Sequence, residues 1–189
     1  MQRSPHGYRQ MNAEELLFEI AGQFPCYDIL HTHSRCVCHK ATELAQKSGV
    51  PVDLGFVQDA CWLHDIGICQ VNAPSIQCFG TEDYMCHGIT GAQMLRHRGL
   101  ESLARVCERH IGVGLTREDI VSQILPLPPR DFLPETLEEK LVCYADNFFS
   151  KNPDFLCAEK SFERIQAGIM KHGTGAYERL MQLHDLFGE

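Results

Sequence analysis

Residues 61–67 read Cys-Trp-Leu-His-Asp-Ile-Gly. His64 and Asp65 stand side by side at the end of an apolar run, just before a glycine. Neighbouring helical positions point about 100° apart, so one rigid element offers an imidazole nitrogen and a carboxylate oxygen in two directions. This arrangement suits a metal cation. A second such pair, His184-Asp185, stands near the end of the chain, where we expect it on the surface.

Helical patterns flank this stretch on both sides, because apolar residues recur there at intervals of three and four. Asn12 with Glu15 and Thr136 with Glu139 are capping pairs that open helices. No alternation typical of a strand extends over five residues, so we predict an all-α fold, a helical bundle. Residues 66–82 are expected to form a loop. The expected helices cover residues 12–24, 28–47, 51–65, 83–98, 103–110, 136–146, 157–171 and 174–187, with a short helix opening at residue 116.

Composition restricts the possible partners and compartments. The formal net charge is −8 and no basic stripe offsets it, which argues against long nucleic acid as a partner. No apolar run approaches the roughly 20 residues of a membrane span, and the N-terminus lacks a secretion signal, so we expect a cytoplasmic protein without membrane contact. The ten cysteines include no Cys-x-x-Cys pair. We interpret them as reduced structural thiols, with a soft-metal or redox role as the alternative.

Potential metal ligands recur on five separate helices. The intervals from one to the next, taken from the first residue of the central pair, are 31, 23, 23 and 36 residues, close to one helix-turn-helix step each. Helices of a bundle can direct such residues to one interior point. These residues are His33, His64, Asp65, His87, His110 and Asp146.

Each of these residues also has a simpler interpretation. A lone inward histidine is more often a hydrogen-bonded core residue than a ligand. Asp146 is harder to explain in that way, because a buried carboxylate without a partner costs several kcal/mol. Six such groups buried together favour a cation over a purely structural role. Two cations are possible if one carboxylate bridges them, and Asp65 is the candidate bridge.

Five stretches together resemble the HD-domain superfamily, and the His-Asp-Ile-Gly form is that of its HDIG-type members. The similarity runs from about residue 28 to residue 150. The stretches are His33-Ser34-Arg35-Cys36-Val37, Leu63-His64-Asp65-Ile66-Gly67, His87-Gly88-Ile89-Thr90-Gly91-Ala92, Arg109-His110-Ile111-Gly112 and Ala145-Asp146-Asn147.

The resemblance implies an all-helical, metal-dependent phosphohydrolase fold in a single domain. It implies that His33, His64, Asp65 and Asp146 hold a first metal, and that His87 and His110, together with Asp65, hold a second. The chain departs from some binuclear members, which have two successive histidines where His110 is followed by isoleucine. The second metal shell is therefore less completely matched than the first.

On this basis we divide the chain into three parts. Residues 1–27 are expected to form an N-terminal helix that packs on the domain. Residues 28–150 are expected to form the HD domain with the metal site, and residues 151–189 to form C-terminal helices that complete the bundle. The sequence makes no prediction of the oligomeric state.

The chemistry expected at this site is hydrolysis of a phosphate ester or anhydride in a small, nucleotide-like substrate. One or two divalent transition-metal ions (Fe, Mn, Zn, Co or Ni) suit a shell of nitrogen and oxygen donors. Asp65 and His64 are the candidate catalytic residues. Arg130 and Lys151 are interpreted either as phosphate contacts or as solvated side chains, and Glu82 or Asp83 as a possible proton shuttle.

Three alternatives stay open. HD-domain proteins with the same six ligands include mixed-valent di-iron oxygenases, which use dioxygen to cleave carbon–phosphorus or carbon–carbon bonds. A second alternative is a binding or sensing module that has lost catalysis, although a complete ligand set argues against it. A third is a cyclic-dinucleotide phosphodiesterase. The Gly-Tyr-Pro element of that subgroup is missing after the His-Asp pair, where Ile66-Gly67-Ile68 stands.

Overall fold

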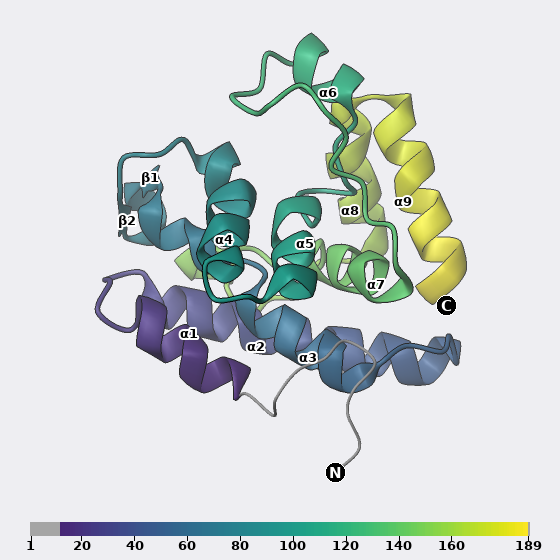
Figure 1. The fold of residues 1–189 in the computed structure, drawn as a ribbon. Coiled ribbons are helices and arrows are strands. Elements are labelled where there is room, and N and C mark those ends of the chain that lie inside the picture. The colour runs from purple at the N-terminus through teal and green to yellow at the C-terminus, as the bar shows by residue number, and fades with distance from the viewer. Residues whose placement is uncertain (1–11, 189) are drawn as a thin grey trace.

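The structure is a computed structural model that describes residues 12–188. Helices dominate this part of the chain, with one small antiparallel hairpin of strands β1 (Asn72–Ala73) and β2 (Cys78–Phe79) (Figure 1). The prediction of an all-α, single-domain fold is confirmed. The helices are α1 (Ala13–Ala21), α2 (Tyr27–Ser48), α3 (Leu54–Leu63), α4 (His87–Arg96), α5 (Glu101–Arg109), α6 (Arg117–Ser122), α7 (Leu137–Asp146), α8 (Phe162–Ile169) and α9 (Thr174–Phe187).

Local capping signals fix where helices begin. The Asn12 side chain accepts a hydrogen bond from the Glu15 amide at 3.2 Å, and α1 starts at the next residue. Thr136 and Glu139 form the complete reciprocal capping box at the start of α7. Each cap of this kind stabilises a helix by about 1 kcal/mol. Both predicted starts are therefore confirmed.

The predicted end of the first helix is wrong. We expected it to reach residue 24, but α1 ends at Ala21. The Gly22 amide still donates to the Phe18 carbonyl, after which the chain turns. Pro25 disfavours the helical conformation at the residue before it, so the helix cannot continue up to the proline.

The helices pack in layers that meet at the centre of the molecule. In Figure 1, α1, α2 and α3 lie together in one layer, and α4, α5 and α7 lie over them. Helix α2 contacts both α3 and α7, α4 contacts α5, and α9 covers α7. The core is continuous across these contacts; Leu30 on α2, Leu63 on α3 and Leu141 on α7 are fully buried. Residues at the inner ends of these helices are therefore brought close to one another.

Gly67 allows the close approach of α4 to the stretch that follows α3. A Cβ atom at this position would collide with the backbone carbonyl of His87 and the backbone amide of Gly91. Only glycine avoids this clash, because it has no side chain. The last residue of the 61–67 stretch thus holds the first residue of α4 beside Asp65.

Residues 66–82 are more ordered than the expected loop. They contain the short 3₁₀ helices Ile66–Gln70 and Pro74–Ile76 and the hairpin of β1 and β2. Two-residue strands are too short to produce an alternating pattern in the sequence, which is why the hairpin was not predicted. Further 3₁₀ turns lie at Tyr84–Cys86, Pro153–Phe155 and Met170–His172.

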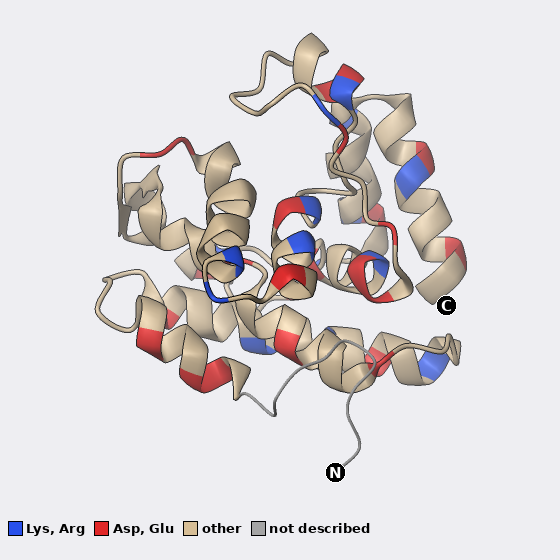
Figure 2. Cartoon of the chain, viewed as in Figure 1, with Lys and Arg blue, Asp and Glu red and all other residues tan. Residues whose placement is uncertain are grey.

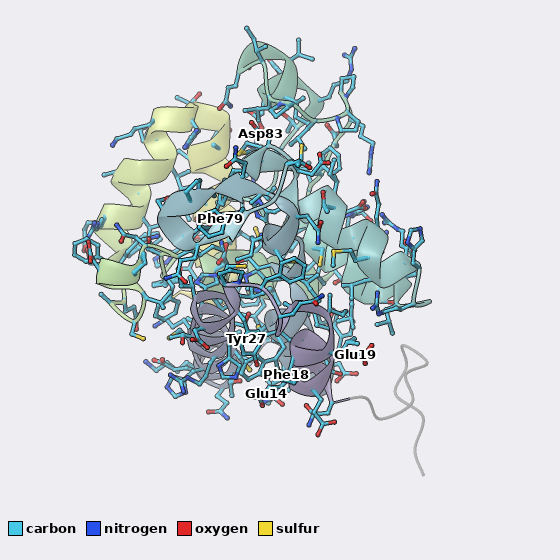
Figure 3. The ribbon with its side chains drawn as sticks, turned by 90° about the vertical axis from the view of Figure 1, so that its left-hand side faces the viewer. Glu14, Phe18, Glu19, Tyr27, Phe79 and Asp83 are labelled. Atoms are coloured by element: carbon cyan, nitrogen blue, oxygen red, sulfur yellow. The ribbon has the colours of Figure 1, made fainter. Side chains whose placement is uncertain are left out.

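The surface carries both charged and apolar features. Basic residues are interspersed with acidic ones along the cartoon in Figure 2, and the Arg105 side chain contacts both Glu135 and Glu139 at 2.8 Å. Phe18 and Phe79 are more than 60% exposed on the side shown in Figure 3. Among residues 12–188, no helix combines the length and apolar character needed to cross a bilayer.

Candidate metal centre

The six residues predicted as metal ligands lie together where the helix layers meet. Every histidine among them and the central aspartate are at most 3% exposed, and the last carboxylate is 15% exposed. Their ligand atoms form two overlapping groups, each within 4.8 Å. The set comprises His33 from the middle of α2, His64 and Asp65 directly after α3, His87 at the start of α4, His110 directly after α5 and Asp146 at the end of α7.

The two carboxylate oxygens of Asp65 face different groups of ligand atoms. Its Oδ2 atom lies 3.3 Å from Nε2 of His33 and 3.3 Å from Nε2 of His64. Its Oδ1 atom lies 3.4 Å from Nε2 of His87 and 3.3 Å from Nε2 of His110. One carboxylate therefore faces two pairs of imidazoles, one pair with each oxygen.

Asp146 completes the first group from α7. Its Oδ1 atom lies 2.8 Å from Nε2 of His33 and 3.5 Å from Nε2 of His64. In the second group, the Nε2 atoms of His87 and His110 lie 3.2 Å apart. The first group thus has four donor residues and the second has three, with Asp65 common to both.

Backbone carbonyls orient three of the four imidazoles. The Nδ1 atoms of His64, His87 and His110 lie 2.7, 2.5 and 2.7 Å from the carbonyl oxygen three residues earlier. A carbonyl can only accept, so Nδ1 carries the hydrogen and donates it. In a neutral ring, Nε2 then has the free lone pair, and it is directed at the centre. Histidine ligands of metals are usually held by this kind of outer contact.

The donor atoms fit divalent transition-metal ions. Within residues 12–188, His64 Nε2 and Asp65 Oδ1 are buried without a hydrogen-bond partner. Leaving such atoms unsatisfied costs several kcal/mol, and a cation removes that cost. Imidazole nitrogens mixed with carboxylate oxygens are donors typical of Fe, Mn, Co, Ni or Zn sites. The cluster thus supports binding of a divalent metal.

The charges of the centre are strongly coupled. Burial alone would raise the pKa of Asp65, but the nearby charges of Lys151 and His64 hold it well below its usual range. Burial lowers the pKa of His64, yet Asp65 and Asp146 outweigh it and raise that pKa to about 10. Burial lowers the pKa of His87 to about 3. At neutral pH and without a cation, the carboxylates are ionised and His87 is neutral. His64 is protonated on both ring nitrogens and is therefore positively charged.

Lys151 belongs to the centre, whereas Arg130 does not. The Lys151 side chain is 11% exposed, and its Nζ atom lies 2.7 Å from Asp65 Oδ2. The Arg130 side chain is 52% exposed and binds Glu108 at 3.2 Å. From the sequence, both residues were expected to be either phosphate contacts or solvated groups. The one available signal for Lys151 was its place five residues after Asp146, just beyond a helix end.

Asp83 was expected as a possible proton shuttle, and its side chain has a structural contact instead. The side chain of Asp83 accepts a hydrogen bond from the Met85 amide at 2.8 Å, so it caps a 3₁₀ turn.

His184 was expected on the surface and is instead half-buried. Its ring stacks on the ring of Phe162 with 3.8 Å between the centroids, and its Nδ1 atom lies 2.7 Å from the Tyr144 hydroxyl. The expectation was wrong because α9 packs on α7, which places His184 against the side chain of Tyr144.

Known proteins similar to this chain include three archaeal relatives. An uncharacterised protein of Methanocaldococcus jannaschii is 39% identical over 145 residues, which cover 74% of this chain and 78% of the relative. A protein of Thermoplasma volcanium named tRNA (cytidine(56)-2'-O)-methyltransferase is 30% identical over 90% of this chain, and one of the same name from Picrophilus torridus is 35% identical over 65%. The matches span only 45% and 32% of those two longer proteins.

No solved structure matches the chain significantly. The HD domain family matches residues 30–150, a range that contains all six residues of the centre. The match covers more than half of the sequence, and the M. jannaschii relative covers most of the same region at 39% identity. The chain therefore belongs to the HD domain family.

Proposed function

We propose that this protein is a metal-dependent phosphohydrolase that acts on a phosphate ester or anhydride of a small, nucleotide-like molecule. The proposal rests mainly on the shared carboxylate of Asp65, whose two oxygens face separate pairs of imidazoles. A carboxylate in this position is suited to bridge two cations, and paired cations are a recurring device for phosphoryl hydrolysis.

Each residue of the centre has a role in this proposal. His33, His64, Asp65 and Asp146 would hold the first ion, and His87 and His110 would share Asp65 to hold the second. Divalent ions bound there would polarise a phosphoryl oxygen and make water acidic enough to serve as the nucleophile near neutral pH. In the overall reaction water adds to phosphorus, the P–O bond to the leaving group breaks, and the leaving oxygen receives the proton.

The protein contributes orientation and exclusion of water. The carbonyl contacts of His64, His87 and His110 keep their Nε2 atoms aimed at the centre before any substrate arrives. Burial of Asp65 keeps the site in a low-dielectric environment, where each charge interaction is stronger than in water. We also propose that residues 28–150 form the catalytic domain, with α1 packed against it and with the segment after residue 150 contributing Lys151. Of the predicted outer parts 1–27 and 151–189, residues 1–11 and 189 lie outside the described residues.

The experiment is a turnover assay with metal-loaded protein on phosphate esters and nucleotides, run in air and under strict anaerobiosis. Phosphate release at the same rate in both conditions is expected, because hydrolysis consumes only water. Turnover that requires dioxygen and iron would replace the proposal with the di-iron oxygenase alternative. No turnover by a protein shown to contain metal would also contradict it.

A further inference from the structure

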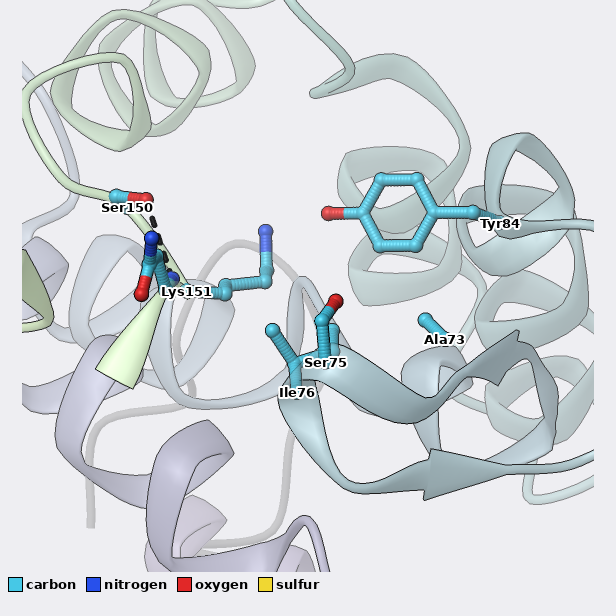
Figure 4. A pocket seen from close by; sticks show the side chains of 7 residues that line it. Ala73, Ser75, Ile76, Tyr84, Ser150 and Lys151 are labelled. Atoms are coloured by element: carbon cyan, nitrogen blue, oxygen red, sulfur yellow. Dashed lines mark hydrogen bonds between the residues drawn. The ribbon is translucent and has the colours of Figure 1, made fainter. Parts of the chain in front are cut away.

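A cavity of about 370 Å³ opens beside the candidate metal centre. It lies between the hairpin region, the turn before α4 and the segment after α7 (Figure 4). Ligand pockets commonly measure about 300–1,000 Å³, so this one suits a small molecule. Its lining residues are Ala73, Ser75, Ile76, Tyr84, Ser150, Lys151 and Asn152.

Lys151 joins this cavity to the centre. It is the one charged residue among those that line the cavity, and its ammonium group contacts Asp65 Oδ2 at 2.7 Å. In Figure 4 the Tyr84 hydroxyl points across the cavity toward the side chain of Lys151. A ligand in the cavity would therefore meet a cation next to the candidate bridging carboxylate.

The charge balance indicates which ligand fits. Asp65 and Asp146 together carry two negative charges, fewer than the four positive charges of two divalent ions. Once Asp65 is shared between cations, it no longer neutralises Lys151, and a buried ammonium group without a counter-ion is costly. A phosphomonoester carries close to two negative charges at neutral pH, whereas a diester carries one. A bound phosphomonoester therefore offsets more of the surplus positive charge than a phosphodiester does.

The polar groups of the lining fit the rest of such a molecule. Ser75 and Tyr84 present hydroxyl groups to the cavity (Figure 4), and hydroxyls both donate and accept hydrogen bonds. Tyr84 is 37% exposed, and its ring lies 4.9 Å from the ring of His87, centroid to centroid. The lining thus offers hydrogen bonds to a hydroxyl-bearing alcohol, such as a sugar.

We infer that Lys151 is a substrate-binding residue that selects phosphomonoesters of small hydroxyl-bearing alcohols over phosphodiesters. This inference rests on the proposed phosphohydrolase function and names the substrate class of the same site. Lys151 would bind a non-bridging oxygen of the terminal phosphate. Water would then displace the alcohol, giving the free alcohol and inorganic phosphate.

The test compares two esters with the same leaving group, p-nitrophenyl phosphate and bis(p-nitrophenyl) phosphate, on metal-loaded wild type and Lys151→Met. For the variant, kcat/KM on the monoester should fall about ten- to a hundredfold, the loss expected for a buried charge-assisted hydrogen bond. On the diester it should change by less than about threefold. Lys151→Arg, which keeps the charge, should recover part of the monoester activity. An equal fall on both esters would overturn the inference.

A binding measurement separates this inference from the proposed function. Inorganic phosphate titrated calorimetrically into metal-loaded protein should bind about tenfold more weakly to Lys151→Met, with metal content equal to wild type. The exposed Lys171 supplies a matched control, and Lys171→Met should leave phosphate affinity and both activities unchanged. If wild type hydrolyses neither ester nor any of the nucleotides, the proposed function fails, and phosphate affinity alone then decides the role of Lys151. Unchanged phosphate affinity, or loss of metal from Lys151→Met, would refute that role.

Discussion

The chain contains the dipeptide His-Asp twice, and the structure uses the two copies differently. His64 and Asp65 are fully buried and lie within 3.5 Å of ligand atoms from four other helical elements. His184 is half-buried against Phe162 and Tyr144, and Asp185 is exposed. Identical local sequence therefore gives a candidate metal centre at one place and a packing contact at the other.

A His-Asp dipeptide therefore carries no metal-binding chemistry without its surroundings. Around His64 and Asp65, four other helices end or pass close by, and each supplies one imidazole or carboxylate. Around His184, the neighbours are aromatic side chains from α7 and from the start of α8. The number of converging donors, rather than the motif, distinguishes the two sites. The following predictions test that distinction, beginning with the largest effect.

Replacement of the shared carboxylate should have the largest effect. We expect Asp65→Ala to abolish hydrolysis and remove both metal ions, because each group of donors loses its common member. Metal content by mass spectrometry and phosphate release measure the two effects. Asp185→Ala is the matched control and should retain both, since that carboxylate is exposed. A fully metal-loaded, active Asp65→Ala protein would contradict the role of Asp65.

Single histidine variants should divide the centre into its two halves. His33→Ala removes a member of the four-residue group, and His87→Ala removes a member of the three-residue group. We expect His87→Ala to retain more of the first metal ion than His33→Ala does. Equilibrium metal titration of the two variants provides the comparison. The same loss of all metal in both would indicate one undivided site.

Metal binding should displace a proton from the centre. The pKa of His64, about 10 in the metal-free protein, lies above the ordinary value, so at pH 7 the ring is protonated and must release its proton to coordinate. Calorimetric titration in buffers of different ionisation enthalpy should show release of about one proton per chain at pH 7.

The same raised pKa gives a stability effect in the metal-free protein. A histidine whose folded-state pKa is raised stabilises the fold below its unfolded-state pKa of about 6.5, and this stabilisation is lost as pH rises toward 10. Metal-free wild type should therefore lose more stability between pH 7 and 10 than His64→Ala. An identical pH profile for the two, together with no proton release, would contradict this assignment.

His184 should matter only for the stability of the fold. His184→Ala removes the contact with the Tyr144 hydroxyl and the stack on Phe162, which together should cost about 1–2 kcal/mol. Chemical denaturation should show this loss while metal content and turnover stay at the wild-type level. A fall in metal content without unfolding would show that the two His-Asp pairs are coupled.

Local patterns in the sequence predicted much of the fold. The capping pair of Thr136 and Glu139, for example, marks the start of α7 because its two hydrogen bonds depend only on neighbouring residues. The convergence of the six donor residues followed from their spacing together with the resemblance to the HD-domain superfamily. Their roles as ligands stay predictions, although the structure brings all six together.

The features that were not predicted depend on contacts between distant parts of the chain. Lys151 reaches Asp65 because the chain continues from α7 back toward the end of α3, and no periodic pattern in the sequence indicates that path. The burial of His184 likewise depends on how α9 lies against α7. The hairpin at residues 72–79 depends on pairing of two strands too short to be recognised.

The metal content of wild-type protein purified without added cations tests the shared metal centre directly. We expect about two transition-metal ions per chain, with activity lost on chelation and restored by adding the ions back. A preparation that is free of metal and fully active would contradict it.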